Sequence, residues 1–150
     1  AQVRIPNIKP DALPAEPGAY LLMLALESAT TLPPRFDGLV LTDGFYVYTG
    51  SAYGPGGIRA RCRRHISRPK ARHWHVDWLT SAANDISVAA FPGKTECALV
   101  RSLSGLPGAQ FPVPGFGSSD CRRCQAHLLR FPDPKIVKTF CERPRLDRHH

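Results

Sequence analysis

The most continuous apolar stretch of the chain runs from Gly18 to Leu26 and reads GAYLLMLAL. Pro17 precedes it and the polar pair Glu27 and Ser28 follows it, so both ends are well marked. A strand that is apolar at nearly every position is typical of the buried centre of a sheet. We therefore predict that this stretch is a central strand.

A second strand is predicted from Phe45 to Thr49, where successive side chains point to alternate faces. Tyr46 and Tyr48 share one face. If the two strands are neighbours, Tyr20 and Tyr48 lie on the same side of the sheet. Gly50 is expected to end the strand.

A glycine-rich turn then leads into an arginine-rich helix. Gly54, Gly56 and Gly57 permit positive φ, so the turn is expected to bring backbone N–H groups close to an anion. From Ile58 the apolar residues recur every fourth position, which predicts a helix with one apolar stripe. Between positions 58 and 72 the chain has seven Arg or Lys residues and no acid: Arg59, Arg61, Arg63, Arg64, Arg68, Lys70 and Arg72.

The remaining elements follow from the same periodicities and from turn residues. The prolines of residues 1–17 remove backbone donors and predict an extended arm that lies on the domain. The other predicted elements are strands at 31–36 and 39–41 joined by an Asp37-Gly38 turn, a helix at 73–83, a strand at 85–91, a helix at 96–103 capped by Thr95, a strand at 125–131 and a short element at 135–141. Residues 18–150 are thus expected to form a single α+β domain, a small mainly antiparallel sheet flanked by helices.

The charge of the chain indicates a polyanionic partner. Its 150 residues carry 20 Lys and Arg against 12 Asp and Glu, which gives a net charge of +8. Clustering of the basic residues on one predicted helix and the loop after it favours nucleic acid. The alternative is a solvated basic face without a ligand. The predicted phosphate contacts are Arg59, Arg63, Arg64, Arg68, Lys70 and Arg72.

Two features of the sequence bear on the cellular location of the protein. Its longest apolar run is too short to span a membrane, and Arg4, Lys9 and Asp11 interrupt the region where a signal peptide needs an apolar core. The five cysteines are an odd number, which without an export signal favours a reducing compartment. We expect a cytoplasmic protein that does not bind membranes.

Glu96 is the first residue of a predicted helix and lies on the apolar side of that helix. Glu96, Leu99, Val100 and Leu103 are spaced i, i+3, i+4 and i+7, which puts the carboxylate on the stripe that faces the core. We expect a cation or a strong hydrogen-bond donor to face it there. The alternative is that Glu96 only complements the positive end of the helix, which stabilises by ~0.3–1 kcal/mol.

A segment near the C-terminus has a spacing typical of metal ligands. Cys121, Cys124 and His127 follow the pattern C-x2-C-x2-H and are three of the four ligands that a structural zinc ion needs. Candidates for the fourth ligand are Cys141, His73 and His75. Reduced, partly buried thiols are the alternative, because the sequence has no second spaced pair.

Several of these segments resemble one known family. Gly18-Ala19-Tyr20 and Tyr48-Thr49-Gly50, followed by Arg61, His65 and Glu96, are similar in type and order to the signature of the GIY-YIG nuclease superfamily. The similarity is closer to an uncharacterised branch known as domain of unknown function one-hundred-and-twenty-three, through YVYTGSAYGPGGIRARCRRH, HWHVDWL, TECALV and GFGSSDC. The resemblance covers most of the chain from Gly18 to Phe131.

This resemblance implies a metal-dependent endonuclease that hydrolyses DNA phosphodiester bonds, as in DNA repair. Its catalytic residues would be Tyr20, Tyr48, Arg61, His65 and Glu96. Glu96 would hold one Mg²⁺ or Mn²⁺. Tyr20 would position or deprotonate the attacking water, with its pKa lowered by Arg61 and the metal. Tyr48 would hydrogen-bond beside this water, Arg61 would bind the scissile phosphate, and His65 would relay a proton or pack.

Two alternatives to a nuclease stay open. The asparagine that usually completes the family's active site has no clear counterpart in this sequence, so a nucleic-acid-binding relative that does not cleave is one alternative. A zinc-stabilised interaction module built on Cys121, Cys124 and His127 is the other. The expected partner of a nuclease is DNA, including branched or damaged DNA, with specificity supplied by a protein partner or a fusion.

Overall fold

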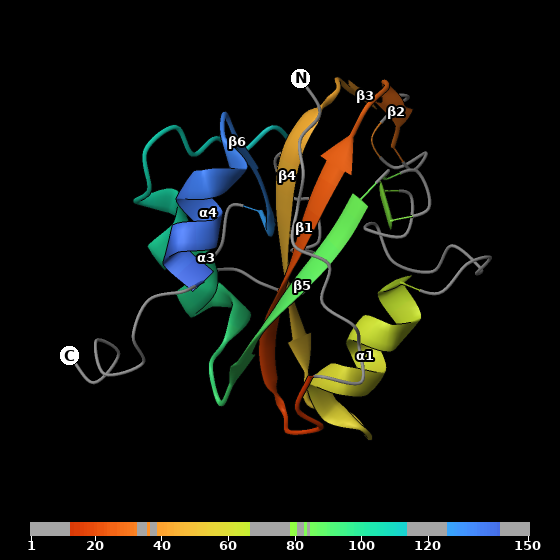
Figure 1. Ribbon diagram of the computed structural model, residues 1–150, viewed down its shortest axis with the longest axis vertical. Helices are drawn as coiled ribbons and strands as arrows, with labels where there is room; N and C mark the ends of the chain where they lie inside the picture. The colour runs from red at the N-terminus through yellow and green to blue at the C-terminus, as the bar shows by residue number, and fades with distance from the viewer. Residues whose placement is uncertain are drawn as a thin grey trace.

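The computed structural model describes residues 13–32, 36, 39–66, 79–80, 83, 85–113 and 126–141. Its centre is a four-stranded antiparallel sheet with the strand order β5-β1-β4-β6 (Figure 1). β1 (Gly18–Leu26) pairs along its length with β4 (Gly44–Ala52) on one side and with β5 (Asp85–Pro92) on the other. β6 (Leu128–Phe131) pairs with the other edge of β4. The fold is α+β, as the sequence predicts.

Helices cover the two faces of this sheet. α1 (Gly57–Ile66) lies on one face, and α3 (Glu96–Ser104) with α4 (Pro134–Cys141) lies on the other (Figure 1). β1 is buried at all nine positions, as its continuous apolar sequence predicts. Tyr20 and Leu22 pack on the α1 side, whereas Leu21 and Met23 pack on the α3 side. The alternation of β1 therefore decides which side chains belong to which face.

β4 is longer than the sequence predicted. It continues through Gly50 to Ala52, because Gly18 at the start of β1 pairs with Ala52. The expectation that Gly50 ends the strand is thus wrong. Gly50 instead leaves room for the ring of Tyr20, since a Cβ at position 50 would lie 2.3 Å from the phenol.

A separate two-stranded ribbon is formed by β2 (Thr30–Thr31) and β3 (Val40–Leu41). The predicted pairing of these segments is confirmed, but the first strand is much shorter than the expected 31–36. Leu32 already lies outside the strand, and the next residues in the sequence are Pro33 and Pro34, which cannot donate to a ladder. The predicted Asp37-Gly38 turn falls outside the described residues.

The helices after β4 agree with the sequence where they are described. Thr95 caps α3 as predicted, because its hydroxyl accepts a hydrogen bond from the Ala98 N–H at 3.1 Å. Of the predicted helix at 73–83, only 79–80 and 83 are described, and Leu79 and Thr80 are helical. The strand expected at 125–131 begins at Leu128, and the short element at 135–141 is α4.

No helix in the described part of the chain is long and apolar enough to cross a membrane.

The last residues of the N-terminal arm, 13–17, lie against the start of α1. Carbonyl oxygens of Glu16 and Pro14 accept hydrogen bonds from the N–H groups of Ile58 and Arg59. The Arg59 Nε also donates to the Leu13 carbonyl at 2.8 Å. The chain itself therefore satisfies these N–H groups, so those of Ile58 and Arg59 are not available to an anion.

Candidate active site

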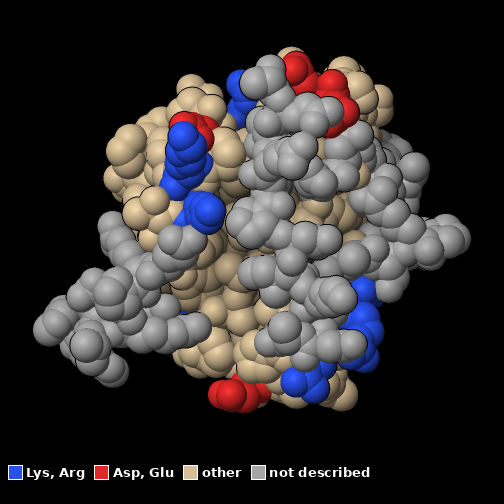
Figure 2. Space-filling view, viewed as in Figure 1, with Lys and Arg blue, Asp and Glu red and all other residues tan. Residues whose placement is uncertain are grey.

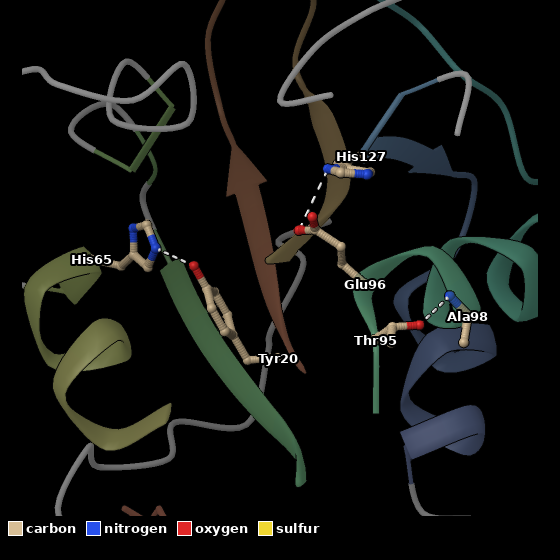
Figure 3. A network of polar contacts seen from close by, with 6 residues as sticks. All are labelled: Tyr20, His65, Thr95, Glu96, Ala98 and His127. Atoms are coloured by element: carbon tan, nitrogen blue, oxygen red, sulfur yellow. Dashed lines mark hydrogen bonds and ion pairs between the residues drawn. The ribbon is translucent and has the colours of Figure 1, made fainter. Parts of the chain in front are cut away.

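A buried tyrosine and a buried histidine meet between β1 and α1 (Figure 3). The Tyr20 hydroxyl lies 2.7 Å from His65 Nε2, and the two residues are only 1% and 0% exposed. β1 turns Tyr20 toward α1, while His65 lies on the same helical stripe as Ile58 and Cys62. The fold thus joins two of the predicted catalytic residues in one hydrogen-bonded pair.

Tyr48 and Arg61 border this pair. Tyr48 lies on the same face of the sheet as Tyr20, as predicted, and its ring centroid is 6.3 Å from that of His65. Arg61 is half-buried and hydrogen-bonds to the Tyr20 phenol. We refer to Tyr20, Tyr48, Arg61 and His65 as the tyrosine–histidine cluster.

The protonation state of Tyr20 follows from its surroundings. Burial raises the pKa of the Tyr20 phenol well above its ordinary value, Tyr48 and Cys62 act in the same direction, and the charge and hydrogen bond of Arg61 lower it. Burial also raises the pKa of the adjacent Cys62 thiol to about 12. Arg61 therefore lowers the pKa of Tyr20 as predicted, but desolvation of the phenol is the larger effect. A neutral phenol can donate its O–H to His65 Nε2.

Glu96 lies on the opposite face of the sheet. It is the first residue of α3 and shares a stripe with the buried Leu99, Val100 and Leu103, as its spacing predicts. Its Oε2 atom is 3.6 Å from His127 Nδ1. In Figure 3 β1 lies between this pair and the pair of Tyr20 and His65. The fold therefore gathers four predicted catalytic residues and places Glu96 across the sheet from them.

His127 is held in place by its backbone. Its carbonyl accepts the Thr49 N–H at 2.9 Å, which continues the pairing of β4 one residue beyond β6. The residue is 1% exposed, and neither ring nitrogen has a hydrogen-bond partner within the described part of the chain. The spacing of Cys121, Cys124 and His127 marked this histidine as a metal ligand, but no sequence pattern linked it to Glu96.

The other predicted zinc ligands are only partly described. Cys121 and Cys124, together with the fourth-ligand candidates His73 and His75, lie outside the described residues. Cys141 ends α4 and is half-buried. Within the described ranges no three His, Cys, Asp or Glu side chains gather as metal ligands, so Cys141 does not join His127 and Glu96 in such a group.

The predicted phosphate-binding arginines of α1 differ in what they contact. The Arg59 side chain already donates one hydrogen bond within the protein, from its Nε to the Leu13 carbonyl. Arg63 is exposed and Arg64 is half-buried. In Figure 2 blue Lys and Arg atoms gather at the lower right, where α1 lies in Figure 1. The remaining predicted contacts, Arg68, Lys70 and Arg72, lie outside the described residues.

These elements define a small α+β protein in which β1, β4 and an arginine-rich helix contribute the tyrosine–histidine cluster. The chain belongs to the family described as Domain of unknown function DUF123, which matches it over residues 19–147. The resemblance of the sequence to that family is thereby confirmed. Comparisons with curated proteins and with solved structures found no match.

Gly50→Ala is expected to destabilise the fold by ~1–3 kcal/mol, because the added Cβ would lie 2.3 Å from the Tyr20 phenol and overpack it. Urea denaturation measures the loss. Gly54→Ala is a matched control, since nothing lies within 4 Å of its Cβ position, and its free energy of unfolding should change by less than about 0.5 kcal/mol. Equal stability of the two variants would contradict the packing of Tyr20 over Gly50.

Proposed function

We propose that this chain is a metal-dependent endonuclease that hydrolyses phosphodiester bonds of DNA. The observation that carries the proposal is the 2.7 Å contact between the Tyr20 hydroxyl and His65 Nε2, bordered by Tyr48 and Arg61. Three elements, β1, β4 and α1, contribute these side chains to one place. They are also the residues that the resemblance to GIY-YIG nucleases implies.

A phosphodiester would first meet the partly exposed members of the cluster. The Arg61 guanidinium would bind the non-bridging oxygens and stabilise the negative charge that builds on them during attack. The Tyr48 hydroxyl would hydrogen-bond beside it. Arg63 and Arg64 on the same helix would bind flanking phosphates of the strand.

The pair of Tyr20 and His65 would accept the proton of the attacking water. Because the phenol stays protonated, Tyr20 is not a base by itself, and its O–H donates to Nε2 while its oxygen accepts from water. As water gives a proton to Tyr20, Tyr20 gives its own proton to His65. The resulting hydroxide attacks phosphorus, the P–O bond to the leaving oxygen breaks, and that oxygen takes a proton from solvent.

Glu96 fits the Mg²⁺ or Mn²⁺ that such an enzyme requires, because a carboxylate is a usual ligand of these ions. A partly exposed carboxylate faces a buried imidazole whose ring nitrogens have no hydrogen-bond partner in the described chain, and both groups are common ligands of divalent cations. A bound Mg²⁺ or Mn²⁺ would polarise a phosphate oxygen or the leaving oxygen.

One DNA strand could contact both groups of residues only by crossing the edge of β4. β6 pairs with β4 only as far as Tyr48, and His127 adds one more hydrogen bond at Thr49. Among the described residues no strand covers this edge beyond Thr49, and the next residue is Gly50, which has no side chain. A DNA backbone that crosses the edge there would meet Tyr48 on one face and Glu96 on the other.

A nucleic-acid-binding protein without cleavage is the second candidate function. It is favoured by the position of Glu96 across the sheet from Tyr20 and by the raised pKa of the Tyr20 phenol. Both candidates use the same arginine-rich helix and the same partner, DNA. They differ only in whether the phosphodiester bond breaks.

We place either function in the cytoplasm. Cys62 is a buried free thiol, which suits a reducing compartment. DNA that is accessible there is the expected partner.

A cleavage assay tests the proposal and separates the two candidates. Supercoiled plasmid and branched DNA are incubated with the chain, with and without Mg²⁺ or Mn²⁺. We expect nicked or linear products only when a divalent metal is present. Binding without products under every metal condition would favour the non-cleaving candidate, and the absence of both binding and products would contradict both.

DNA affinity is expected to fall steeply with salt, because phosphate contacts release counterions. The double variant Arg63→Ala/Arg64→Ala should reduce the slope of log affinity against log salt by about one unit for each lost contact. Fluorescence anisotropy at several salt concentrations measures the slope. Lys135→Ala/Lys138→Ala is the control, because it removes the same charge from exposed positions on α4, on the opposite side of the sheet. A salt-independent affinity would remove nucleic acid as the partner.

A further inference from the structure

We propose that Glu96 and His127 are two ligands of one divalent transition-metal ion. The role of this ion as the metal of the nuclease rests on the proposed function, whereas its binding does not. The inference joins two sites that the sequence kept apart, Mg²⁺ or Mn²⁺ at Glu96 and zinc at Cys121, Cys124 and His127. In this inference Glu96 binds the same ion as His127. The sequence pattern had instead suggested Cys141, His73 or His75 as the additional ligand.

The first argument is the state of the His127 side chain. A buried imidazole normally has hydrogen bonds at its polar atoms, and leaving such an atom without a partner destabilises the fold. His127 is 1% exposed and lacks a hydrogen-bond partner at both ring nitrogens in the described chain. Its backbone is nevertheless fixed by the bond to Thr49, so the ring is held where it is. A metal ion would satisfy one nitrogen directly.

The second argument is the distance from His127 Nδ1 to Glu96 Oε2. At 3.6 Å it is longer than a charge-assisted N–H···O⁻ hydrogen bond, which is typically ~2.7–2.9 Å. Two ligand atoms that are each ~2.1 Å from one ion lie ~3.4 Å apart at the tetrahedral angle and ~3.0 Å apart at 90°. The observed separation is close to the ~3.4 Å expected across a tetrahedral ion.

The donor set indicates which metal would bind. Imidazole nitrogen is a ligand of zinc and other transition metals, whereas Mg²⁺ takes oxygen ligands and keeps several waters. A site with one nitrogen and one carboxylate oxygen should therefore prefer Zn²⁺ to Mg²⁺. The side chain of Glu96 is 27% exposed, so a position on the ion facing solvent is open to water or to a phosphate oxygen.

Metal titration of the whole chain tests the proposal without DNA. The background variant His149→Ala/His150→Ala removes adventitious binding by the terminal histidines, and isothermal titration calorimetry follows Zn²⁺ and Mg²⁺ after chelator treatment. We expect His127→Gln to weaken Zn²⁺ binding by at least the ~10–100-fold that loss of an outer-shell partner costs, while Mg²⁺ binding changes little. Glu96→Gln should weaken both. Glu16→Gln, at an exposed carboxylate, is the control and should change neither.

A ligand swap keeps the test decisive if His127→Gln fails to fold. Glu96 is partly exposed, so Glu96→His should be tolerated, and it should retain Zn²⁺ binding while losing Mg²⁺ binding. A purely structural contact between these residues would not produce such a change in metal preference. Zn²⁺ affinity that is unchanged in both Glu96→Gln and His127→Gln would overturn the inference, whether or not the chain cleaves DNA. The expected affinities without DNA cleavage would instead support the inference and contradict the proposed function.

Discussion

Glu96→Gln is expected to lower DNA cleavage by roughly 10²–10⁴-fold while DNA binding stays the same or becomes tighter. Glutamine keeps the size of the side chain but removes the charge that would hold the metal. A metal ion stabilises the transition state by several kcal/mol, and each 1.36 kcal/mol is about tenfold in rate. Loss of a negative charge also removes repulsion toward phosphates. Single-turnover cleavage and anisotropy measure the two effects separately.

Arg61→Ala provides the contrast, because it should weaken both cleavage and binding. A hydrogen-bond donor whose interaction strengthens in the transition state is typically worth about 10²–10³-fold in rate.

The control for Glu96→Gln is Glu16→Gln, which removes one negative charge at an exposed position. Normal cleavage by Glu96→Gln would contradict the catalytic role of Glu96.

The strands were predictable where a single physical cause decides them. Gly18–Leu26 is apolar at nearly every position, and its predicted bounds are those of β1. Thr95 is a hydroxyl residue directly before an apolar stripe, and it caps α3. Gly50 was misread, because glycine has two uses in a strand, as a breaker and as a space for a neighbouring ring. Only the pairing of β1 with β4 shows that the second applies here.

The candidate site likewise has one part that local sequence patterns indicate and one part that they do not. The pair of Tyr20 and His65 follows from two local rules, the alternation of β1 and the stripe of α1, together with the resemblance to a family. The meeting of Glu96 with His127 depends on strand register, which no local pattern specifies. A shift of one residue between β4 and β6 would turn His127 to the other face of the sheet.

The sequence did not predict which groups the N-terminal arm contacts, for a similar reason. The glycines before α1 predicted N–H groups aimed at an anion, and prolines predicted an extended arm. Neither pattern showed that the carbonyl oxygens of Pro14 and Glu16 would reach those N–H groups. An anion bound by α1 would therefore contact its arginine side chains rather than the N–H groups of Ile58 and Arg59.

Tyr20→Phe is expected to leave the chain folded but to lower cleavage by about 10²–10⁴-fold, the usual contribution of general acid–base catalysis. The substitution keeps the ring in the core and removes only the hydroxyl that contacts His65 Nε2. It should still cost ~1–3 kcal/mol of stability, because a buried imidazole nitrogen loses its partner. His65→Leu should cost a similar amount, since the buried hydroxyl then lacks its acceptor.

The double variant Tyr20→Phe/His65→Leu separates a catalytic pair from a structural one. Replacing both members of a buried hydrogen bond by apolar groups can be nearly neutral, so the double variant should regain most of the stability that each single variant loses. Cleavage should not recover, because no group remains to accept the proton of the attacking water. Urea denaturation and single-turnover cleavage of the four proteins measure both quantities. If cleavage returned together with stability, Tyr20 and His65 would serve the core alone, and the arginine-rich helix would belong to a protein that binds DNA without cutting it.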